Sequence, residues 1–312
     1  MAIHTKLELH DAIYIGEQFG LDVKSSGPIK EGLRNSSYLL ETHGISRYIL
    51  RICEGKTQEQ AKNLVELIEY LFDNGFPSQE PVRASNGSQV NHEGKPVIML
   101  KYIEGNTIKD LTTKQLDQLG QCIAKMHMIS TPEFLSQQHP FGFEAYKKII
   151  RSIDSDYIGW FNQKKEYFER TIPDDLPKGI IHGDLWYDNA IYHEDNLAGI
   201  IDFESGHQGN CIFDIGQTII GTCRMNGSLD YNKAKALVDG YQKVRPLEDT
   251  EKELLKTAAA HAAAVISIWR FHYFSLQNGN GVSEMYLDAV NLSERLNTLE
   301  NKKFMNVVFG YN

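Results

Sequence analysis

The chain has 312 residues, which at roughly 150 residues per domain predicts two domains or lobes. Hydrophobic residues make up 41% and charged residues 23%, which is ordinary for a globular protein and excludes disordered and low-complexity architectures. Lys and Arg number 32 against 41 Asp and Glu, so the net charge is −9 without a long basic run. Nucleic acid is therefore not expected as a partner, and an anionic ligand would need a local positive site.

Cysteine spacing and hydropathy favour a reduced protein outside membranes. The four cysteines form no C-x-x-C pair, so neither a zinc site nor a disulfide framework is indicated. The start, MAIHTKLELH, lacks the apolar core of a secretory signal. The most apolar stretch, TAAAHAAAVISIW, is shorter than the roughly 20 residues of a membrane span and contains His261. We expect a cytoplasmic protein with no membrane partner, and both monomer and homodimer stay open.

The first hundred residues are predicted to be mostly antiparallel strands with one inserted helix. Two β-rich runs are followed by a T-x-x-Q capping box that starts a helix. The segments PVRAS and SQVNH then predict a hairpin, and VIMLKYI is a further strand. The residues that mark these features are His43-Gly44 at the first turn, Thr57 and Gln60 at the helix start, Gly75 at its end and Asn86-Gly87 at the hairpin.

After Gly105 helical periodicity dominates, and one β-rich island, GIIHGDLWYDNAIYHEDNLAGIIDFE, interrupts it. No Pro/Ser linker separates the two parts, so the lobes are expected to be joined tightly. The predicted fold is α+β, with a small antiparallel β-rich N-terminal lobe, residues 1–101, and a larger, mainly α-helical C-terminal lobe, residues 102–312. Its helices are expected near 116–126, 143–170, 230–243, 248–277 and 282–298.

The β-rich island presents polar residues at fixed spacing. An apolar run leads into a loop with His182 and Asp184, and Asn189 follows five residues after Asp184. If a four-residue hairpin loop, 194–197, joins the next two strands, the register places Asn189 opposite Asp202. An amide oxygen and a carboxylate about 5 Å apart would form the oxygen-rich cation site that Mg²⁺ prefers.

This arrangement is typical of phosphoryl transfer. One aspartate accepts the proton of an attacking hydroxyl, while an Asn and a second Asp hold the magnesium that bridges the nucleotide phosphates. Asp184 is therefore the candidate general base, and Asn189 and Asp202 are the candidate metal ligands. His182 is interpreted as a residue that orients the loop. Asp214, in IFDIG, is expected to cap the next helix and to brace the loop.

The small lobe is expected to bind the nucleotide. A Gly/Ser/Asn turn within residues 27–42 can present backbone N–H groups to phosphates, although a plain hairpin turn fits it equally well. Arg51 lies late in a strand, where kinases place a cation for the α- and β-phosphates, with Glu59 as the expected partner and Glu66 as the alternative. The backbone of VIMLKYI is expected to meet the adenine edge. The candidate nucleotide-binding residues are therefore Asn35, Ser36, Ser37, Arg51, Glu59, Lys101 and Ile103.

The sequence HGDLWYDN, followed by IIDFE and FDIG, resembles the aminoglycoside phosphotransferase and choline kinase superfamily, whose members are relatives of the protein kinases. Similar segments cover most of residues 27–275, and the chain is most similar to the homoserine kinases of that fold. The resemblance implies a bilobal protein-kinase-like fold with ATP and Mg²⁺ as cofactors. It also implies a small-molecule alcohol as substrate, with the hydroxyl of L-homoserine as the first candidate acceptor.

Two positions depart from the homoserine kinase pattern. The chain has Trp186 and Tyr187 where those enzymes tend to carry F-P, and Glu204 where they carry an aromatic residue after D-F. The second departure is closer to choline and ethanolamine kinases. A choline, ethanolamine or aminoglycoside-type kinase therefore stays open. A nucleotide-binding pseudokinase is the alternative of another class, although such proteins usually lack the base or a metal ligand.

Acidic and aromatic residues are the candidates for acceptor binding. Asp188 and Glu204 can pair with an amino group, and Trp186 can attract a quaternary ammonium by a cation–π contact. Three further aromatic residues could complete such a box, although their helical spacing is more typical of core packing: Trp269, Phe271 and Tyr273.

Overall fold

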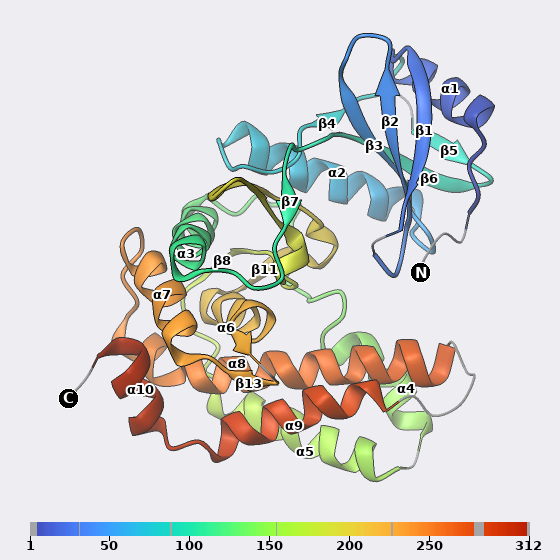
Figure 1. The fold of residues 1–312 in the computed structure, drawn as a ribbon. Coiled ribbons are helices and arrows are strands. Elements are labelled where there is room, and N and C mark those ends of the chain that lie inside the picture. The colour runs from blue at the N-terminus through green and yellow to red at the C-terminus, as the bar shows by residue number, and fades with distance from the viewer. Residues whose placement is uncertain are drawn as a thin grey trace. The chain divides into compact units, whose positions relative to one another are not determined.

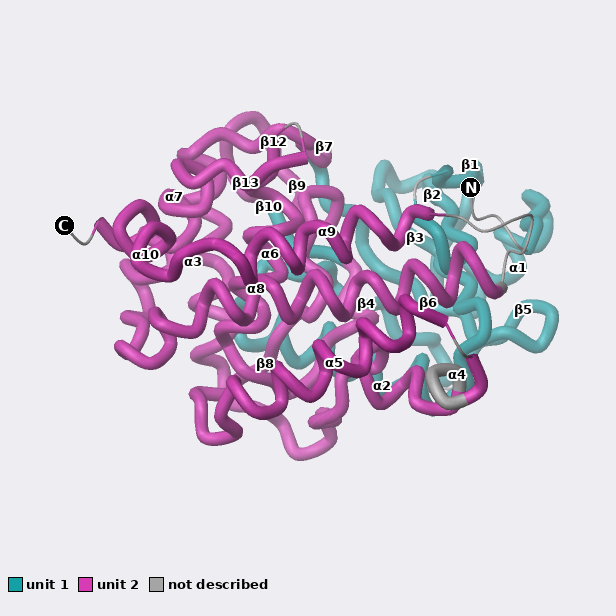
Figure 2. Tube along the Cα trace, turned by 90° about the horizontal axis from the view of Figure 1, so that it is seen from below, with its two compact units in different colours: residues 1–105, 198–201 teal, residues 106–197, 202–312 magenta. Residues whose placement is uncertain are grey.

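The computed structural model describes residues 5–30, 32–87, 89–153, 155–225, 227–277 and 284–310. The chain divides into two compact units, one of residues 1–105 with 198–201 and the other of residues 106–197 with 202–312 (Figure 2). The first is an antiparallel sheet with two helices, and the second is mainly helical (Figure 1). The predicted α+β fold class is confirmed, whereas the functions assigned to residues 1–101 and 102–312 stay predictions.

The first unit is built around one antiparallel sheet in the order β1-β2-β3-β6-β4, with β5 also paired to β6. One of its apolar cores is formed by buried residues of α1 and of the sheet, including Ile15, Leu40 and Leu50. The elements are α1 (Leu9–Gln18), β1 (Val23–Ile29), β2 (Ser36–Thr42), β3 (Arg47–Ile52), α2 (Gln58–Asp73), β4 (Pro81–Val82), β5 (Val90–His92) and β6 (Lys95–Lys101).

Local sequence signals locate most of these elements. The capping box of α2 is confirmed, because the Thr57 side chain accepts from the backbone N–H of Gln60 and the Gln60 side chain accepts from that of Thr57. The turn at residues 43–44 joins β2 to β3 as expected. Gly75 follows Asn74, the C-cap residue of α2, and has a φ of 75°, which suits a residue without a Cβ.

The predicted hairpin at Asn86-Gly87 is wrong. Strands β4 and β5, which flank this turn, both pair with β6 and not with each other. The true hairpin joins β5 to β6 through Glu93-Gly94, whose φ angles of 50° and 75° suit a tight two-residue turn. Ser88, which belonged to the predicted hairpin, lies outside the described residues.

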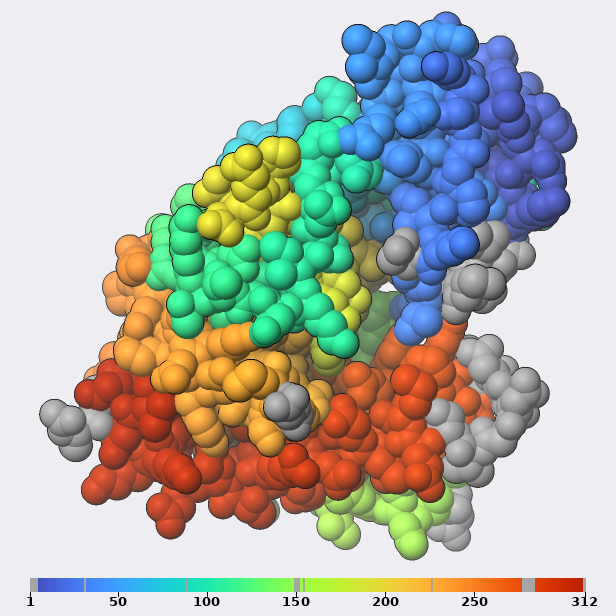
Figure 3. Space-filling view, viewed as in Figure 1, coloured from blue at the N-terminus to red at the C-terminus, as the bar shows by residue number. Residues whose placement is uncertain are grey.

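The second unit contains most of the helices and several short strands. In the space-filling view the surface of its last two helices lies beside that of α8 (Figure 3). Residues 282–283 of the last long predicted helix lie outside the described residues. The elements are β7 (Asn106–Thr107), α3 (Thr113–Met128), η1 (Phe143–Tyr146), α4 (Lys147–Ser152), α5 (Asp156–Thr171), β8 (Lys178–Ile181), η2 (Tyr187–Asn189), β9 (Ala190–His193), β10 (Asn196–Ile200, which the first unit shares), η3 (Phe203–Ser205), β11 (His207–Asn210), α6 (Cys211–Thr222), β12 (Arg224–Met225), β13 (Ser228–Leu229), α7 (Tyr231–Gln242), α8 (Asp249–Arg270), the π-helical segment Phe271–Gln277, α9 (Met285–Thr298) and α10 (Asn301–Phe309).

Two glycines allow α3 and α7 to approach each other closely. A Cβ at Gly120 would overlap the carbonyl oxygen of Leu237, and a Cβ at Gly240 would overlap that of Asp117. Larger residues at either position would force the helices apart, so this contact depends on the absence of side chains.

The alanine-rich stretch of α8 supplies much of the core of the second unit. Its buried alanines pack with Ile181 and Ile220, which come from β8 and α6. This packing explains why the stretch TAAAHAAAVISIW is so apolar. Among the described residues, no helix is both long and apolar enough to span a membrane.

Candidate active site

The 182–189 loop begins where β8 ends. Strand β8 pairs with β11, and Ile181 lies opposite His207 in this ladder. The chain turns at Gly183, whose φ is 73°. A Cβ at Gly183 would lie 2.7 Å from the carbonyl oxygen of Ser205. The glycine of H-G-D is therefore required both by its backbone conformation and by this close approach.

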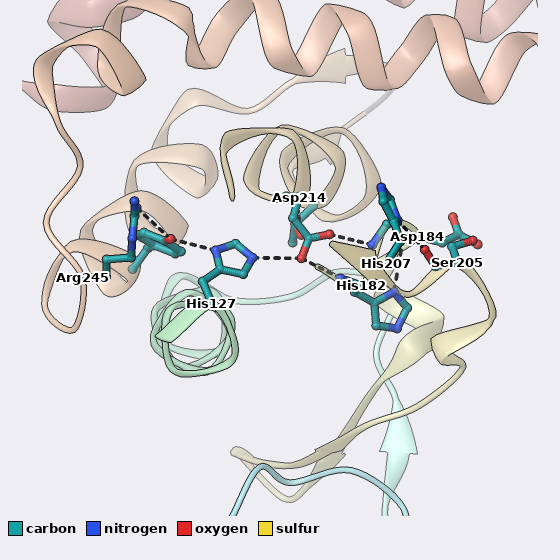
Figure 4. Close-up of polar contacts among 10 residues, drawn as sticks. His127, His182, Asp184, Ser205, His207, Asp214 and Arg245 are labelled. Carbon is teal, nitrogen blue, oxygen red and sulfur yellow. Dashed lines mark hydrogen bonds and ion pairs between the residues drawn. The ribbon is translucent and has the colours of Figure 1, made fainter. Parts of the chain in front are cut away.

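The buried carboxylate of Asp214 fixes the start of this loop (Figure 4). It accepts hydrogen bonds from the backbone N–H groups of His182 at 3.0 Å and of Gly183 at 2.8 Å. Burial by itself would raise the pKa of Asp214, but its contacts with His127 and with the His182 backbone hold it below the usual value. The expected bracing role is confirmed. The expected capping role is wrong, because Asp214 lies in the first turn of α6 and the N-cap position is occupied by Asn210, whose side chain makes no capping hydrogen bond.

Behind Asp214, a chain of polar contacts extends to α7 and beyond it. Nε2 of His127 on α3 lies 3.1 Å from Asp214, and Nδ1 lies 2.7 Å from the Tyr241 hydroxyl, which accepts from Arg245 at 3.1 Å (Figure 4). Burial lowers the pKa of His127, but Cys211, Tyr241 and the bond to Asp214 raise it well above the usual value. His127 was missed from the sequence, because no spacing motif connects a histidine on α3 with a loop more than 50 residues later.

The candidate base, Asp184, is held through its backbone and its side chain. The backbone N–H of Asp184 donates to Nδ1 of His182 at 3.2 Å, and Nε2 of Gln217 donates to Oδ1 of Asp184 at 3.3 Å. Burial, followed by repulsion from Asp202 and Asp188, raises the pKa of Asp184 to about 7. The hydrogen bond from the Asp184 backbone to the His182 ring is the contact expected of a residue that orients the loop. Gln217, on α6, was not identified from the sequence.

The candidate metal ligands lie on either side of the β9–β10 hairpin. The predicted four-residue loop 194–197 is wrong, because the turn contains only Glu194 and Asp195 and β10 starts at Asn196. The positive φ of Glu194, 54°, allows this tight turn. The register argument for pairing the two ligands therefore fails, and both of them lie outside the strands.

Loop geometry nevertheless brings the oxygen-bearing side chains into one region. Nδ2 of Asn189 donates to the carbonyl oxygen of Asp184 at 2.7 Å, which leaves its amide oxygen for another partner. Asp202 has a left-handed backbone, with φ 68° and ψ 57°, between β10 and η3. Its charge acts on both Asp184 and Asp188, so the three carboxylates are close enough to repel one another.

This donor set fits a hard divalent cation. Asn189 and Asp202 offer oxygen atoms, and a cation would offset the repulsion among the carboxylates. Within the described ranges, no group of three or more His, Cys, Asp or Glu is arranged to hold a metal alone. Mg²⁺ is usually bound by one or two carboxylates together with substrate phosphates, so the pair is sufficient for that mode.

In the first unit, the serines proposed for phosphate binding belong to β2. The Ser36 hydroxyl donates to Oε1 of Glu54 at 2.8 Å, and Oδ1 of Asn35 accepts from the Glu54 backbone at 3.2 Å. Ser37 lies opposite Arg51 in the β2–β3 ladder. The side chains of Asn35 and Ser36 thus help to hold the sheet together through Glu54.

The remaining nucleotide candidates are also in the first unit. Glu59 is exposed in the first turn of α2, whereas the alternative Glu66 lies 3.4 Å from Lys62. The backbone N–H of Lys101 donates to Glu80 at 2.8 Å, and its carbonyl accepts from a side chain at 3.3 Å. Ile103 is therefore the better candidate for the adenine edge. The pairing of Arg51 with Glu59 stays a prediction.

The acceptor candidates are distributed over the 182–189 loop and η3. Trp186 lies against α6, where a Cβ at Gly221 would be 3.1 Å from the indole. The guanidinium carbon of Arg270 lies 5.8 Å from the centroid of the Trp186 ring. Asp188 is exposed in η2, and Glu204 is partly buried in η3.

The proposed aromatic box does not form as a unit. Phe271 packs in the core, with its ring centroid 4.6 Å from that of Tyr157. Trp269 and Tyr273 stack on each other at 5.3 Å. The core-packing interpretation is therefore correct for Phe271, and Trp186 has a cationic side chain over its ring.

A cavity of about 850 Å³ lies beside this loop in the second unit. Its wall includes Ile181, His139, His207 and His261, and it does not include Asp184. Burial lowers the pKa of all three histidines, that of His261 to about 4. These side chains are therefore neutral at pH 7.

The fold and the loop together define a phosphotransferase with a hydroxyl acceptor. A sequence profile of the phosphotransferase enzyme family (APH) matches residues 27–247, and the chain belongs to this family. It is thus a small-molecule phosphotransferase.

Similar sequences include two homoserine kinases. The enzyme of Brucella ovis is 27% identical over 255 residues, which are 78% of each chain. That of Phenylobacterium zucineum is 28% identical over 283 residues, or 87% of each chain.

Solved structures with the same fold include the amicoumacin kinase hAmiN and a microcompartment-associated aminopropanol kinase. The first has a TM-score of 0.73 and 15% identity, and the match covers 95% of this chain and 97% of that one. The second has a TM-score of 0.70 and 16% identity, with 96% and 98% covered. These similarities confirm the kinase-like fold expected from the sequence.

Proposed function

We propose that the protein transfers the γ-phosphoryl group of ATP to the side-chain hydroxyl of L-homoserine. The observation that carries this proposal is the environment of Asp184, whose backbone is held by His182 and whose pKa is raised to about 7 by burial and neighbouring carboxylates. A general base is most effective when its pKa is close to the working pH.

In this reaction Asp184 accepts the proton of the acceptor hydroxyl as the oxygen attacks the γ-phosphorus. Gln217 donates to Oδ1 of Asp184 and helps to hold the carboxylate in place. His182 and Asp214 keep the loop backbone in place while the proton moves. Positioning of this kind supplies much of the rate enhancement in phosphoryl transfer.

Asn189 and Asp202 are proposed to hold Mg²⁺, which when bound offsets the negative charge of the nucleotide phosphates. Arg51 is proposed to bind the α- and β-phosphates, supported by its strand position and by Glu59 in the following helix. The backbone near Ile103 is proposed to contact adenine.

L-Homoserine is favoured as acceptor by the homoserine kinase relatives and by the charge next to Trp186. The cation of Arg270 lies over the indole ring. A quaternary ammonium at this face would meet a like charge, which argues against choline. Family membership, together with a base and two candidate metal ligands, favours catalysis over a pseudokinase.

The test is ADP release with Mg·ATP across L-homoserine, choline, ethanolamine and several aminoglycosides. Turnover on L-homoserine well above the others supports the proposal, and preferred turnover on another acceptor refutes the homoserine assignment. Asp184→Asn should lower kcat at least by the roughly 10²–10⁴-fold typical of a general base, with ATP affinity largely kept. Near wild-type turnover in that variant would exclude Asp184 as the base.

A further inference from the structure

Two arginines and one aspartate meet beside the candidate active site. Arg224, in β12, donates from both terminal nitrogens to Asp288 on α9, at 3.1 and 2.9 Å. Arg270, the last residue of α8, donates to the same carboxylate at 3.3 Å. Three separate elements thus meet at the carboxylate of Asp288. We call Arg224 and Arg270 the arginine pair.

The arginine pair carries more positive charge than Asp288 offsets. Two guanidinium groups against one carboxylate leave an excess of one positive charge. The arginine side chains are only 18% and 19% exposed, whereas that of Asp288 is 51% exposed. Nε of Arg224 is buried without a hydrogen-bond partner among the described residues. Partly buried guanidinium groups with spare donors are suited to bind an additional anionic group.

The position of Trp186 connects this cluster with the proposed chemistry. Its backbone N–H donates to the carbonyl oxygen of Asp184 at 3.1 Å, and the guanidinium carbon of Arg270 lies 5.8 Å from the centroid of its ring. Trp186 thus lies next to the candidate base in the loop, and its ring faces Arg270 of the arginine pair. Gly221 on α6 permits this placement, because a side chain there would displace the indole.

We propose that Arg270 and Arg224 bind the carboxylate of the acceptor, so that the substrate class is a hydroxy amino acid. This inference rests on the proposed function and specifies how the same site selects its acceptor. In extended homoserine the hydroxyl and the carboxylate are roughly 5 Å apart, so one molecule can extend from the 182–189 loop toward the arginine beside Trp186. An amino alcohol without a carboxylate leaves the spare guanidinium donors unused.

The charge of the cluster favours a carboxylate over a phosphate. A carboxylate has one negative charge, which equals the excess of the arginine pair. Its two oxygens also match the planar fork of a guanidinium. A phosphorylated acceptor would bring close to two negative charges into a region that already contains Asp288 and Asp184.

The test compares acceptors that differ only in the carboxylate. The pairs are L-homoserine with 3-amino-1-propanol, L-threonine with 1-amino-2-propanol, and L-serine with ethanolamine. For the wild type, kcat/KM should favour the carboxylate member of at least one pair. In Arg270→Gln or Arg224→Gln this preference should fall roughly 10- to 100-fold, mainly through KM, while turnover of the other member is kept.

Two further variants separate binding from folding. Asp288→Asn removes the competing carboxylate, so the preference should be kept or increased if the arginines bind substrate. If the cluster only holds the fold, Asp288→Asn should lower activity on both members, as the arginine variants would. The control is Arg83→Gln, which removes an arginine that pairs with Glu69 in the first unit and should leave the preference unchanged.

The outcomes distinguish this inference from the proposed function. An equal loss on both members in the arginine variants, or an unchanged preference, overturns the inference even if L-homoserine is the substrate. Preference for L-serine or L-threonine that depends on the arginines supports the inference and refutes homoserine as acceptor. If none of the acceptors is phosphorylated, their binding to the wild type and to Arg270→Gln is measured by calorimetric titration. Binding of the carboxylate member that is weakened by Arg270→Gln supports the inference, and equal or absent binding overturns it.

Discussion

His127 and Asp214 form an ion pair in which neither side chain is exposed, with 3.1 Å between Nε2 and Oδ2. The pair connects α3 to α6. The same carboxylate also holds two backbone N–H groups of the 182–189 loop. A single buried charge therefore couples the packing of the helices to the position of Asp184. Removal of one partner leaves the other charge buried without compensation, which is the costly way to break such a pair.

We expect Asp214→Asn to lower the free energy of unfolding by about 3–5 kcal/mol, the range found when a buried ion pair loses one partner. Urea unfolding of both proteins at pH 7 measures the difference. The matched control is Asp239→Asn, which removes an exposed partner of Lys235 and should cost at most about 0.5 kcal/mol. Equal losses of unfolding free energy in the two variants would show that the buried ion pair stabilises the protein no more than an exposed one.

Asp202→Ala should abolish the magnesium-dependent part of ATP binding, because it removes a proposed oxygen ligand. Calorimetric titrations with ATP alone and with Mg·ATP measure this contribution directly. Asp195→Ala, which removes a carboxylate from the nearby hairpin turn, is the control and should bind Mg·ATP as the wild type does. An unchanged Mg·ATP titration for Asp202→Ala would refute the metal assignment.

Acid should destabilise the protein partly through His261, which lies 5.0 Å from the ring centroids of Phe143 and Phe168. Burial lowers the pKa of His261 from 6.5 to about 4 in the folded state. Between these values the unfolded chain binds a proton that the folded protein does not. Stability therefore falls with decreasing pH, by up to about 1.4 kcal/mol per pH unit for this one group.

The variant His261→Phe removes this titration and keeps an aromatic side chain in place. Urea unfolding from pH 7.5 to 4.5 should give a smaller loss of stability than in the wild type. At pH 7.5 His261 is neutral in both states, so that point isolates the packing effect of the substitution. A parallel pH profile for the two proteins would contradict a depressed pKa at this position.

Gly120→Ala should lower the free energy of unfolding by about 1–3 kcal/mol or more, because the added methyl group overlaps the backbone of α7. Gly159→Ala is the matched control. It lies on α5, and a Cβ there meets nothing within 4 Å. That substitution should stabilise the protein by about 0.5–1 kcal/mol through helix propensity. Changes of the same sign in both variants would refute the close contact between α3 and α7.

Residues close in sequence were predictable, and partners from distant elements were not. The H-x-D loop, its glycine and the capping box of α2 each follow from local spacing and backbone preference. His127 and Gln217 reach the same loop from α3 and α6 through tertiary packing that no local pattern encodes. The arginine pair was missed for the same reason.

The strand register shows a further limit of such reasoning. The sequence predicted a four-residue turn at 194–197, whereas the structure has a two-residue turn at Glu194 and Asp195, with a positive φ of 54° at Glu194. The predicted register had placed Asn189 opposite Asp202. Both residues lie outside the β9–β10 ladder, Asn189 in η2 and Asp202 just before η3, so their positions depend on the loops and not on strand pairing.

The left-handed backbone of Asp202 has a consequence for how this position can vary. Glycine adopts its φ of 68° without strain and Asp or Asn adopt it at a small cost, but this φ is unfavourable for most other residues. The substitution that would relax the chain most, Asp202→Gly, also deletes the carboxylate proposed to bind magnesium. Selection for thermal stability therefore favours glycine at this position, whereas selection for turnover favours aspartate. An aspartate retained here in directed evolution for activity, but lost under selection for stability alone, would reveal that conflict.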